Sequence, residues 1–126
     1  MRASAELGIK GEVLAGEYLE SKGFKITARN FRSRYGEIDI VCERRRQLHF
    51  VEVKTRASDS FMDPVLAVWA PKQEKIRKTA QTFLSGFEGL KFSEYQIYLD
   101  VISVIIPQDS GKVSVRHLEG AFEGRA

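Results

Sequence analysis

The 126-residue chain contains little cysteine, histidine and proline, and two of these scarcities limit what the protein can be. Its single cysteine, Cys42, cannot form an internal disulfide, and with only His49 and His117 beside it no Cys/His zinc framework can be assembled. Carboxylates are therefore expected to hold any metal. The chain also lacks an apolar run long enough for a membrane span or a secretory signal, which predicts a cytoplasmic protein with no membrane partner.

The composition is that of an ordinary globular protein. It is 43% hydrophobic, 29% charged and 10% aromatic, which excludes disordered and collagen-like chains. A chain of this length has room for one hydrophobic core. Residues 1–126 are therefore expected to form a single domain.

Positive charge is concentrated in the middle of the chain. The formal net charge is +3, but residues 29–78 carry twelve Lys and Arg against seven Asp and Glu. Arginine offers a planar fork of donors that suits phosphate oxygens, so this segment favours a nucleic-acid backbone as partner. An ordinary solvated basic face explains the charge alone equally well.

Hydrophobic periodicity predicts an α/β protein with the element order αβββαββ. Gly23 is expected to end the first helix, and Pro71 is expected to lie in the first turn of the second. Residues 55–71 read as a loop with a turn of helix at 64–69, and residues 119–126 are expected to fray. The predicted helices are 5–22 and 72–87, and the predicted strands are 24–31, 36–42, 48–54, 95–106 and 112–118.

Two short motifs, GEID at 36–39 and EVK at 52–54, carry the candidate chemistry. If their strands close around Arg45 and Arg46, Asp39 lies opposite Glu52 and Glu37 lies opposite Lys54. Directly opposed carboxylates destabilise a sheet unless something neutralises them. A divalent cation such as Mg²⁺ or Mn²⁺ would do so, and it favours carboxylate oxygens.

A purely structural interpretation of these motifs stays open. Taken alone, Glu52 and Lys54 are more typical of the polar face of an amphipathic strand, with Glu37 and Lys54 forming a weak cross-strand ion pair. The turn also lacks Asn-Gly or Asp-Gly, and a slip of one residue would place Asp39 and Glu52 on different faces.

A wider set of motifs resembles the YraN family of bacterial proteins, which is similar to archaeal Holliday junction resolvases of the restriction-endonuclease-like, PD-(D/E)xK superfamily. The resemblance covers nearly the whole chain and implies a restriction-endonuclease-like central mixed β-sheet flanked by helices. The sequence departs from the family at Tyr98-Leu99-Asp100-Val101, where Arg-Phe-Asp-Val is usual, and at Phe61-Met62, where Phe-Gly is usual. The motifs that carry the resemblance are Lys10-Gly11-Glu12, Ala28-Arg29-Asn30-Phe31-Arg32, Gly36-Glu37-Ile38-Asp39, Phe50-Val51-Glu52-Val53-Lys54-Thr55-Arg56, Lys72 and Ala121-Phe122.

The resemblance also implies an activity and its residues. It makes Asp39 and Glu52 ligands of Mg²⁺ or Mn²⁺, Lys54 the catalytic lysine and Glu12 a further acidic contributor. The expected function is hydrolysis of phosphodiesters in branched or structured DNA. The alternative is a nucleic-acid-binding or scaffold module that keeps the fold without turnover.

Four basic residues are expected to contact the DNA backbone at the rim of the carboxylate site: Arg29, Arg32, Arg56 and Lys72. A homodimer is expected by analogy with resolvases, which cut two strands symmetrically.

Four further residues are interpreted as structural. Asp100 is expected to be a buried, hydrogen-bonded carboxylate and Cys42 a small core residue. His49 is expected to face solvent or a neighbouring strand, pointing away from Glu52, and Trp69 is expected to pack.

Overall fold

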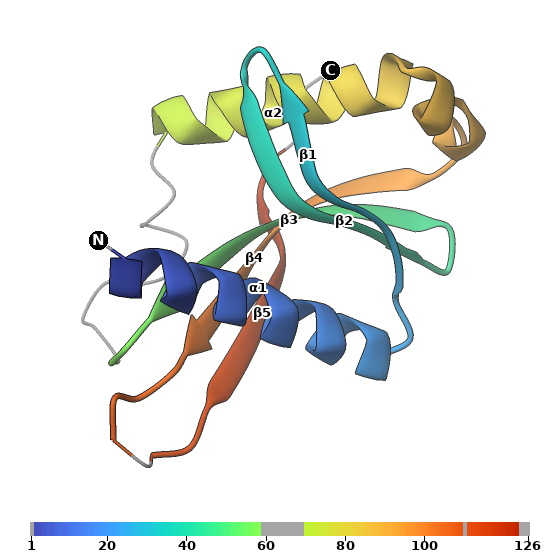
Figure 1. The fold of residues 1–126 in the computed structure, drawn as a ribbon. Helices are drawn as coiled ribbons and strands as arrows, with labels where there is room; N and C mark the ends of the chain where they lie inside the picture. Colours follow the sequence, from blue (N-terminus) through green and yellow to red (C-terminus); the bar gives the residue numbers. More distant parts are fainter. Residues whose placement is uncertain (1, 59–69, 110, 124–126) are drawn as a thin grey trace.

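The computed structural model describes residues 2–58, 70–109 and 111–123, and within them the predicted order of two helices and five strands is confirmed (Figure 1). The one added element is a 3-10 helix, η1, between the second helix and the fourth strand. The elements are α1 (Arg2–Ser21), β1 (Lys25–Ser33), β2 (Gly36–Arg44), β3 (Gln47–Arg56), α2 (Ala70–Ser85), η1 (Phe87–Phe92), β4 (Gln96–Ile105) and β5 (Ser114–Phe122).

The ends of the elements follow their local chemistry. Gly23 adopts the left-handed φ of 90° just after α1, as a helix-terminating glycine does. Pro71 lies in the first turn of α2, as predicted. The prediction that this helix reaches residue 87 is wrong, because Gly86 is extended and turns the chain, leaving Phe87 92% exposed.

Two other expectations concern the loops and the tail. The expected fraying is wrong for residues 119–122, which complete β5. The turn of helix expected at 64–69 lies outside the described residues.

The strands form one mixed sheet in the order β1-β2-β3-β4-β5. β3 and β4 are parallel, and the other neighbouring pairs are antiparallel. Helix α1 packs mainly against β3, whereas α2 packs against β2 and β1 (Figure 1). The expected central mixed sheet flanked by helices is therefore confirmed.

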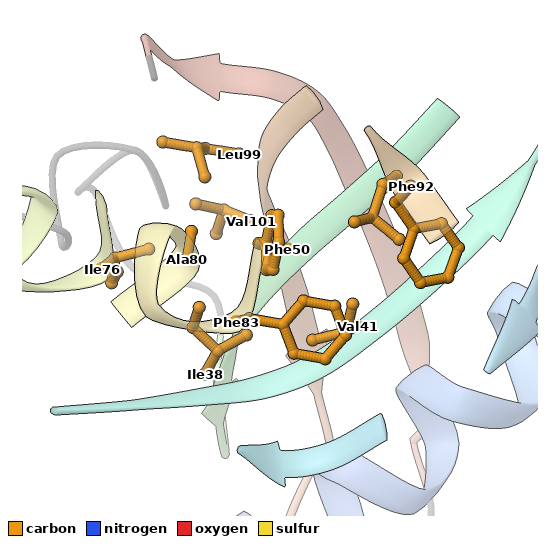
Figure 2. Close-up of a cluster of buried hydrophobic side chains, with 10 residues drawn as sticks. Ile38, Val41, Phe50, Ile76, Ala80, Phe83, Phe92, Leu99 and Val101 are labelled. Carbon is orange, nitrogen blue, oxygen red and sulfur yellow. The ribbon is translucent and has the colours of Figure 1, made fainter. Parts of the chain in front are cut away.

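Two hydrophobic clusters cover the two faces of the sheet. The α1 face contains Ala15 and Leu19 packed with Ile40, Val51 and Ile102. Figure 2 shows the α2 face, where the Phe83 ring meets Phe50 edge to face at 5.6 Å between ring centroids. The buried residues of this second cluster are Ile38, Val41, Leu48, Phe50, Ile76, Ala80, Phe83, Phe92, Leu99 and Val101.

The backbone of β1 is unusual at Asn30. Its flanking residues pair normally, Arg29 with Ile40 and Phe31 with Ile38, but Asn30 takes a left-handed φ of 51°. The usual alternation of faces is interrupted there, so Arg29 lies against α1 whereas the Phe31 ring packs on Phe83 of α2. The interruption falls beside Asp39, where the candidate site is found.

Candidate carboxylate and lysine site

The predicted register of β2 and β3 is confirmed next to their turn. Arg45 and Arg46 both have positive φ, 54° and 60°, as a two-residue type I′ turn requires. Pairing then runs from Arg44 with Gln47 to Ile40 with Val51. The sequence had no Asn-Gly to signal this turn.

Beyond Ile40 the two strands separate, and the two predicted charged pairs are wrong as ladder partners. Asp39 does not sit opposite Glu52 in the ladder; its Oδ2 instead accepts a hydrogen bond from the Val53 N–H at 2.8 Å. Glu37 does not meet Lys54 either, because its carboxylate accepts from the Asn30 amide and lies 3.3 Å from Nε of Arg32. The Asp39 carboxylate thus bonds to the backbone of β3 at the point where β2 and β3 separate.

Asp39 and Glu52 nevertheless lie together, as predicted. Glu52 is only 8% exposed and Asp39 is half-buried. Burial, the hydrogen bond with Glu52 and the negative charge of Glu52 together raise the pKa of Asp39 to about 8, because they disfavour its charged form. Asp39 is therefore largely protonated at neutral pH when no metal ion is bound.

Two lysines face this carboxyl pair. Lys72, near the start of α2, places its Nζ 3.1 Å from Oε2 of Glu52. Lys54 lies two residues beyond Glu52 on β3, and burial together with its contact to Lys72 lowers its pKa. Although burial alone lowers it, the pKa of Lys72 is raised overall by its contact with Lys54 and by the negative charge of Glu52. The sequence assigned Lys72 to the rim of the site, whereas the structure places its ammonium directly against the carboxylate of Glu52.

Glu12 reaches the same place from α1 through a residue that sequence reasoning missed. The Asn30 amide donates to Oε1 of Glu12 at 3.0 Å and to Oε1 of Glu37 at 2.9 Å. The negative charge of Glu12 contributes to the raised pKa of Asp39. Asn30 could have been suspected, since asparagine tolerates the left-handed conformation better than most residues.

The predicted DNA-contacting arginines occupy different settings. Arg29 and Arg32 are exposed on β1, one against Gly16 of α1 and the other beside Glu37. Arg56 is half-buried at the end of β3 and donates to the Ser103 hydroxyl at 3.2 Å. Arg56 therefore has a structural partner on β4 that the sequence did not predict.

Three of the four residues interpreted as structural lie within the described part of the chain. Cys42 is fully buried, and Asp100 is fully buried and hydrogen-bonded, so both predictions are confirmed. His49 points away from Glu52 and bonds to Asp100 on the neighbouring strand, but it is wholly buried and the solvent alternative is wrong. Trp69 lies outside the described residues.

The carboxyl pair suits a small, oxygen-seeking divalent cation. Asp39 and Glu52 offer carboxylate oxygens, the ligands that Mg²⁺ and Mn²⁺ prefer. Oε2 of Glu52 is buried and, within the described part of the chain, makes no hydrogen bond of normal geometry; the Lys72 ammonium offsets its charge. The residues therefore fit such an ion.

Fold and site together define a class of protein. It is an α/β domain with a mixed sheet, in which two carboxylates and two lysines meet where two strands separate. The chain belongs to the family described as uncharacterised protein family UPF0102, whose model matches residues 11–104.

Relatives extend over nearly the full chain. A UPF0102 protein of Syntrophomonas wolfei is 44% identical over 117 residues, covering 93% of this chain and 97% of the relative. One from Geobacter metallireducens is 45% identical over 118 residues, covering 93% and 92%. One from Thermodesulfovibrio yellowstonii is 39% identical over 120 residues, covering 95% and 98%.

No helix among the described residues has the length and apolar character needed to cross a membrane.

Proposed function

We propose that the protein is a metal-dependent endonuclease that hydrolyses phosphodiesters in branched or structured DNA. The observation that carries the proposal is the meeting of Asp39, Glu52, Lys54 and Lys72 where β2 separates from β3. Paired carboxylates that can hold a divalent ion, with a lysine beside them, can support metal-assisted hydrolysis of a phosphodiester. The preference for branched DNA rests on the family resemblance.

Asp39 and Glu52 would hold Mg²⁺ or Mn²⁺. A bound ion of this kind offsets charge on phosphate oxygens and makes water more acidic. The Val53 N–H fixes one oxygen of Asp39, so this carboxylate is oriented by the backbone rather than by a mobile side chain. A ligand held in this way loses little freedom when it binds a cation.

Lys54 is positioned to act on the phosphate. Its stem is half-buried beside the carboxyl pair, and its lowered pKa makes loss of its proton easier than for an exposed lysine. In its charged form it can donate to a phosphate oxygen, and in its neutral form it can accept a proton from attacking water. Glu12, held through Asn30, adds negative charge that strengthens cation binding.

Exposed arginines on β1 supply a contact surface for the DNA backbone. Arg29 and Arg32 lie on the strand next to β2, which carries Asp39. Contacts of arginine with phosphates position a duplex without reading its sequence. We therefore infer binding that is strongly salt-dependent and largely independent of sequence.

The second candidate function is nucleic-acid binding without turnover. The Lys72 ammonium is the specific observation that favours it, because it already offsets the charge of Glu52 without a divalent ion. A site neutralised by its own lysine has no intrinsic need for a metal.

A cleavage assay separates the two functions. Linear, nicked, flap and four-way-junction DNAs are incubated with the protein and Mg²⁺ or Mn²⁺, alongside Asp39→Asn, Glu52→Gln and Lys54→Ala variants purified identically. The nuclease proposal predicts metal-dependent cleavage that is lost in all three variants while DNA binding is kept. Binding without cleavage favours the second function, and full activity in all three variants refutes the assignment of the site.

A further inference from the structure

A second group of polar side chains lies in the interior, on the face of the sheet covered by α1. It consists of His49 on β3, Asp100 on β4 and His117 on β5, which are neighbouring strands. The side chains of His49 and Asp100 are 0% exposed, and that of His117 is 7% exposed. Phe24, from the cluster on this face, packs its edge on the His49 ring at 4.9 Å. Glu52 of the carboxyl pair lies instead against Lys72 of α2, so the two groups are separate.

The three side chains converge on one carboxylate oxygen. Oδ2 of Asp100 lies 2.6 Å from Nδ1 of His49 and 2.7 Å from Nε2 of His117. The three potential ligand atoms all lie within 4.8 Å of one another. Two imidazole nitrogens and one carboxylate oxygen are the donor set that zinc takes in several enzymes.

The backbone of β5 is deformed around this carboxylate. Pairing jumps from Val101 with Leu118 to Leu99 with Phe122, so β5 bulges opposite Asp100. Gly120, at the bulge, has a φ of 60° and donates its N–H to Oδ1 of Asp100 at 2.9 Å. Bulges are frequent next to functional sites, where they redirect side chains.

The hydrogen bonds of His49 do not balance for a neutral ring. Nδ1 faces Oδ2 of Asp100, and Nε2 faces Oε1 of Gln47 at 3.1 Å. The Gln47 amide nitrogen donates to the Tyr98 hydroxyl, which supports this orientation of the amide. Both neighbours of the ring are acceptors, but a neutral imidazole has a single N–H. A cation bound by Nδ1 and Asp100 in place of their direct hydrogen bond removes the conflict, because Nε2–H then donates to Gln47.

We propose that His49, Asp100 and His117 form a binding site for Zn²⁺ or a related transition-metal ion. Its ligands are supported as metal ligands usually are: Gln47 accepts from His49, and Gly120 donates to the second oxygen of Asp100. The three ligands come from three strands, so a bound ion ties β3, β4 and β5 together. Imidazole ligands favour zinc, whereas the carboxyl pair favours Mg²⁺ or Mn²⁺, so the two sites differ in metal preference.

This site does not depend on the proposed nuclease function. Sequence reasoning expected carboxylates alone to hold a metal, because two histidines and one cysteine could not complete a zinc framework. The fold instead supplies Asp100 as the third ligand, from a strand whose place beside β3 is set only by the parallel pairing.

The chain has two histidines in all, which makes the test direct. Tag-free protein labelled with ¹⁵N is freed of bound metal with EDTA. The imidazole nitrogens are then examined by NMR with and without Zn²⁺. The proposal predicts that Nδ1 of His49 and Nε2 of His117 both shift as metal ligands at one equivalent. Two rings that stay unchanged overturn it, and a His49 ring protonated on both nitrogens would then account for its two acceptors.

A calorimetric titration assigns the binding to these residues. Zinc affinity is expected to fall at least tenfold in His117→Gln and to stay within about twofold of wild type in Asp109→Asn, a control in an exposed turn outside both sites. Loss of zinc binding in Glu52→Gln but not in His117→Gln contradicts the proposal. If His117→Gln does not fold, the NMR result on the unmodified protein decides.

Discussion

Replacing Asp39 by asparagine is expected to stabilise the folded protein at alkaline pH, although it removes a proposed metal ligand. The folded-state pKa of Asp39 is about 8, above its ordinary value of 3.8, so folding takes up a proton between these values. The stability that this group contributes is fully present below about pH 4 and is lost as pH rises through 8. The uncharged amide of the Asp39→Asn variant does not ionise, so the variant does not lose this stability as the pH rises.

The size of the effect follows from the shift. About four pH units at roughly 1.4 kcal/mol each correspond to about 6 kcal/mol in the free energy of unfolding. Movement of the Lys72 ammonium toward the ionised pair reduces this loss of stability. We therefore expect Asp39→Asn to be more stable than wild type by about 2–3 kcal/mol at pH 9.5. An amide also preserves the contacts, since its oxygen accepts from the Val53 N–H and its NH₂ donates to Glu52.

The assay is urea unfolding in EDTA at pH 5, 7 and 9.5, with Asp109→Asn as the matched control. Asp109 is exposed in a turn, where its oxygen accepts from the Gly111 N–H, and asparagine can keep that bond. The difference between Asp39→Asn and wild type should widen with pH, while Asp109→Asn should follow wild type throughout. A difference that stays constant or shrinks from pH 5 to 9.5 refutes the reasoning.

Three other outcomes are expected. Lys72→Gln should raise Mn²⁺ affinity by roughly three- to tenfold and weaken DNA binding, because a cation paired with Glu52 is removed. Lys75→Gln, one turn away, should change neither affinity. Calorimetric titration measures the affinity for Mn²⁺. Arg29→Gln should lower the log-log salt slope of DNA affinity by about 0.9, while Lys91→Gln on η1 should leave it unchanged in fluorescence anisotropy. Phe83→Ala should cost about 3–5 kcal/mol in urea unfolding, since its ring fills the centre of the α2-face cluster; a cost below about 1 kcal/mol would contradict that packing.

Much of the fold could be predicted because it is encoded locally. Alternating apolar residues identified the strands, and Gly23 and Pro71 marked helix ends that the structure confirms. The β2–β3 register also followed from sequence, since a two-residue turn leaves a single alignment. The turn residues themselves, Arg45 and Arg46, were poor signals, because arginine is uncommon at positive φ.

The grouping of Asp39, Glu52 and Lys54 was predicted, but the geometry of the group and the parts played by Asn30 and Lys72 were not. Asp39, Glu52 and Lys54 lie on adjacent strands, so their proximity could be inferred from the register alone. Two local features mark the place where the strands separate beyond Ile40: the left-handed conformation of Asn30 and the bond of Asp39 to a backbone N–H. Neither has a periodic signature.

Contacts between distant segments were beyond sequence reasoning. The Lys72 contact with Glu52 requires knowing where α2 begins relative to β3, and the chain between them includes the undescribed residues 59–69. The His49, Asp100 and His117 group likewise depends on the order of β3, β4 and β5 in the sheet. A single sequence does not encode that order in any local pattern.

The central claim, that Asp39 and Glu52 bind a catalytic divalent ion, is tested most directly by calorimetric titration of metal-free protein with Mn²⁺ in the presence of a non-cleavable junction DNA. We expect Mn²⁺ to bind to wild type and to His117→Gln, and its binding to be lost in Asp39→Asn and Glu52→Gln. Absence of Mn²⁺ binding to wild type, or equal binding to Glu52→Gln, would contradict the central claim.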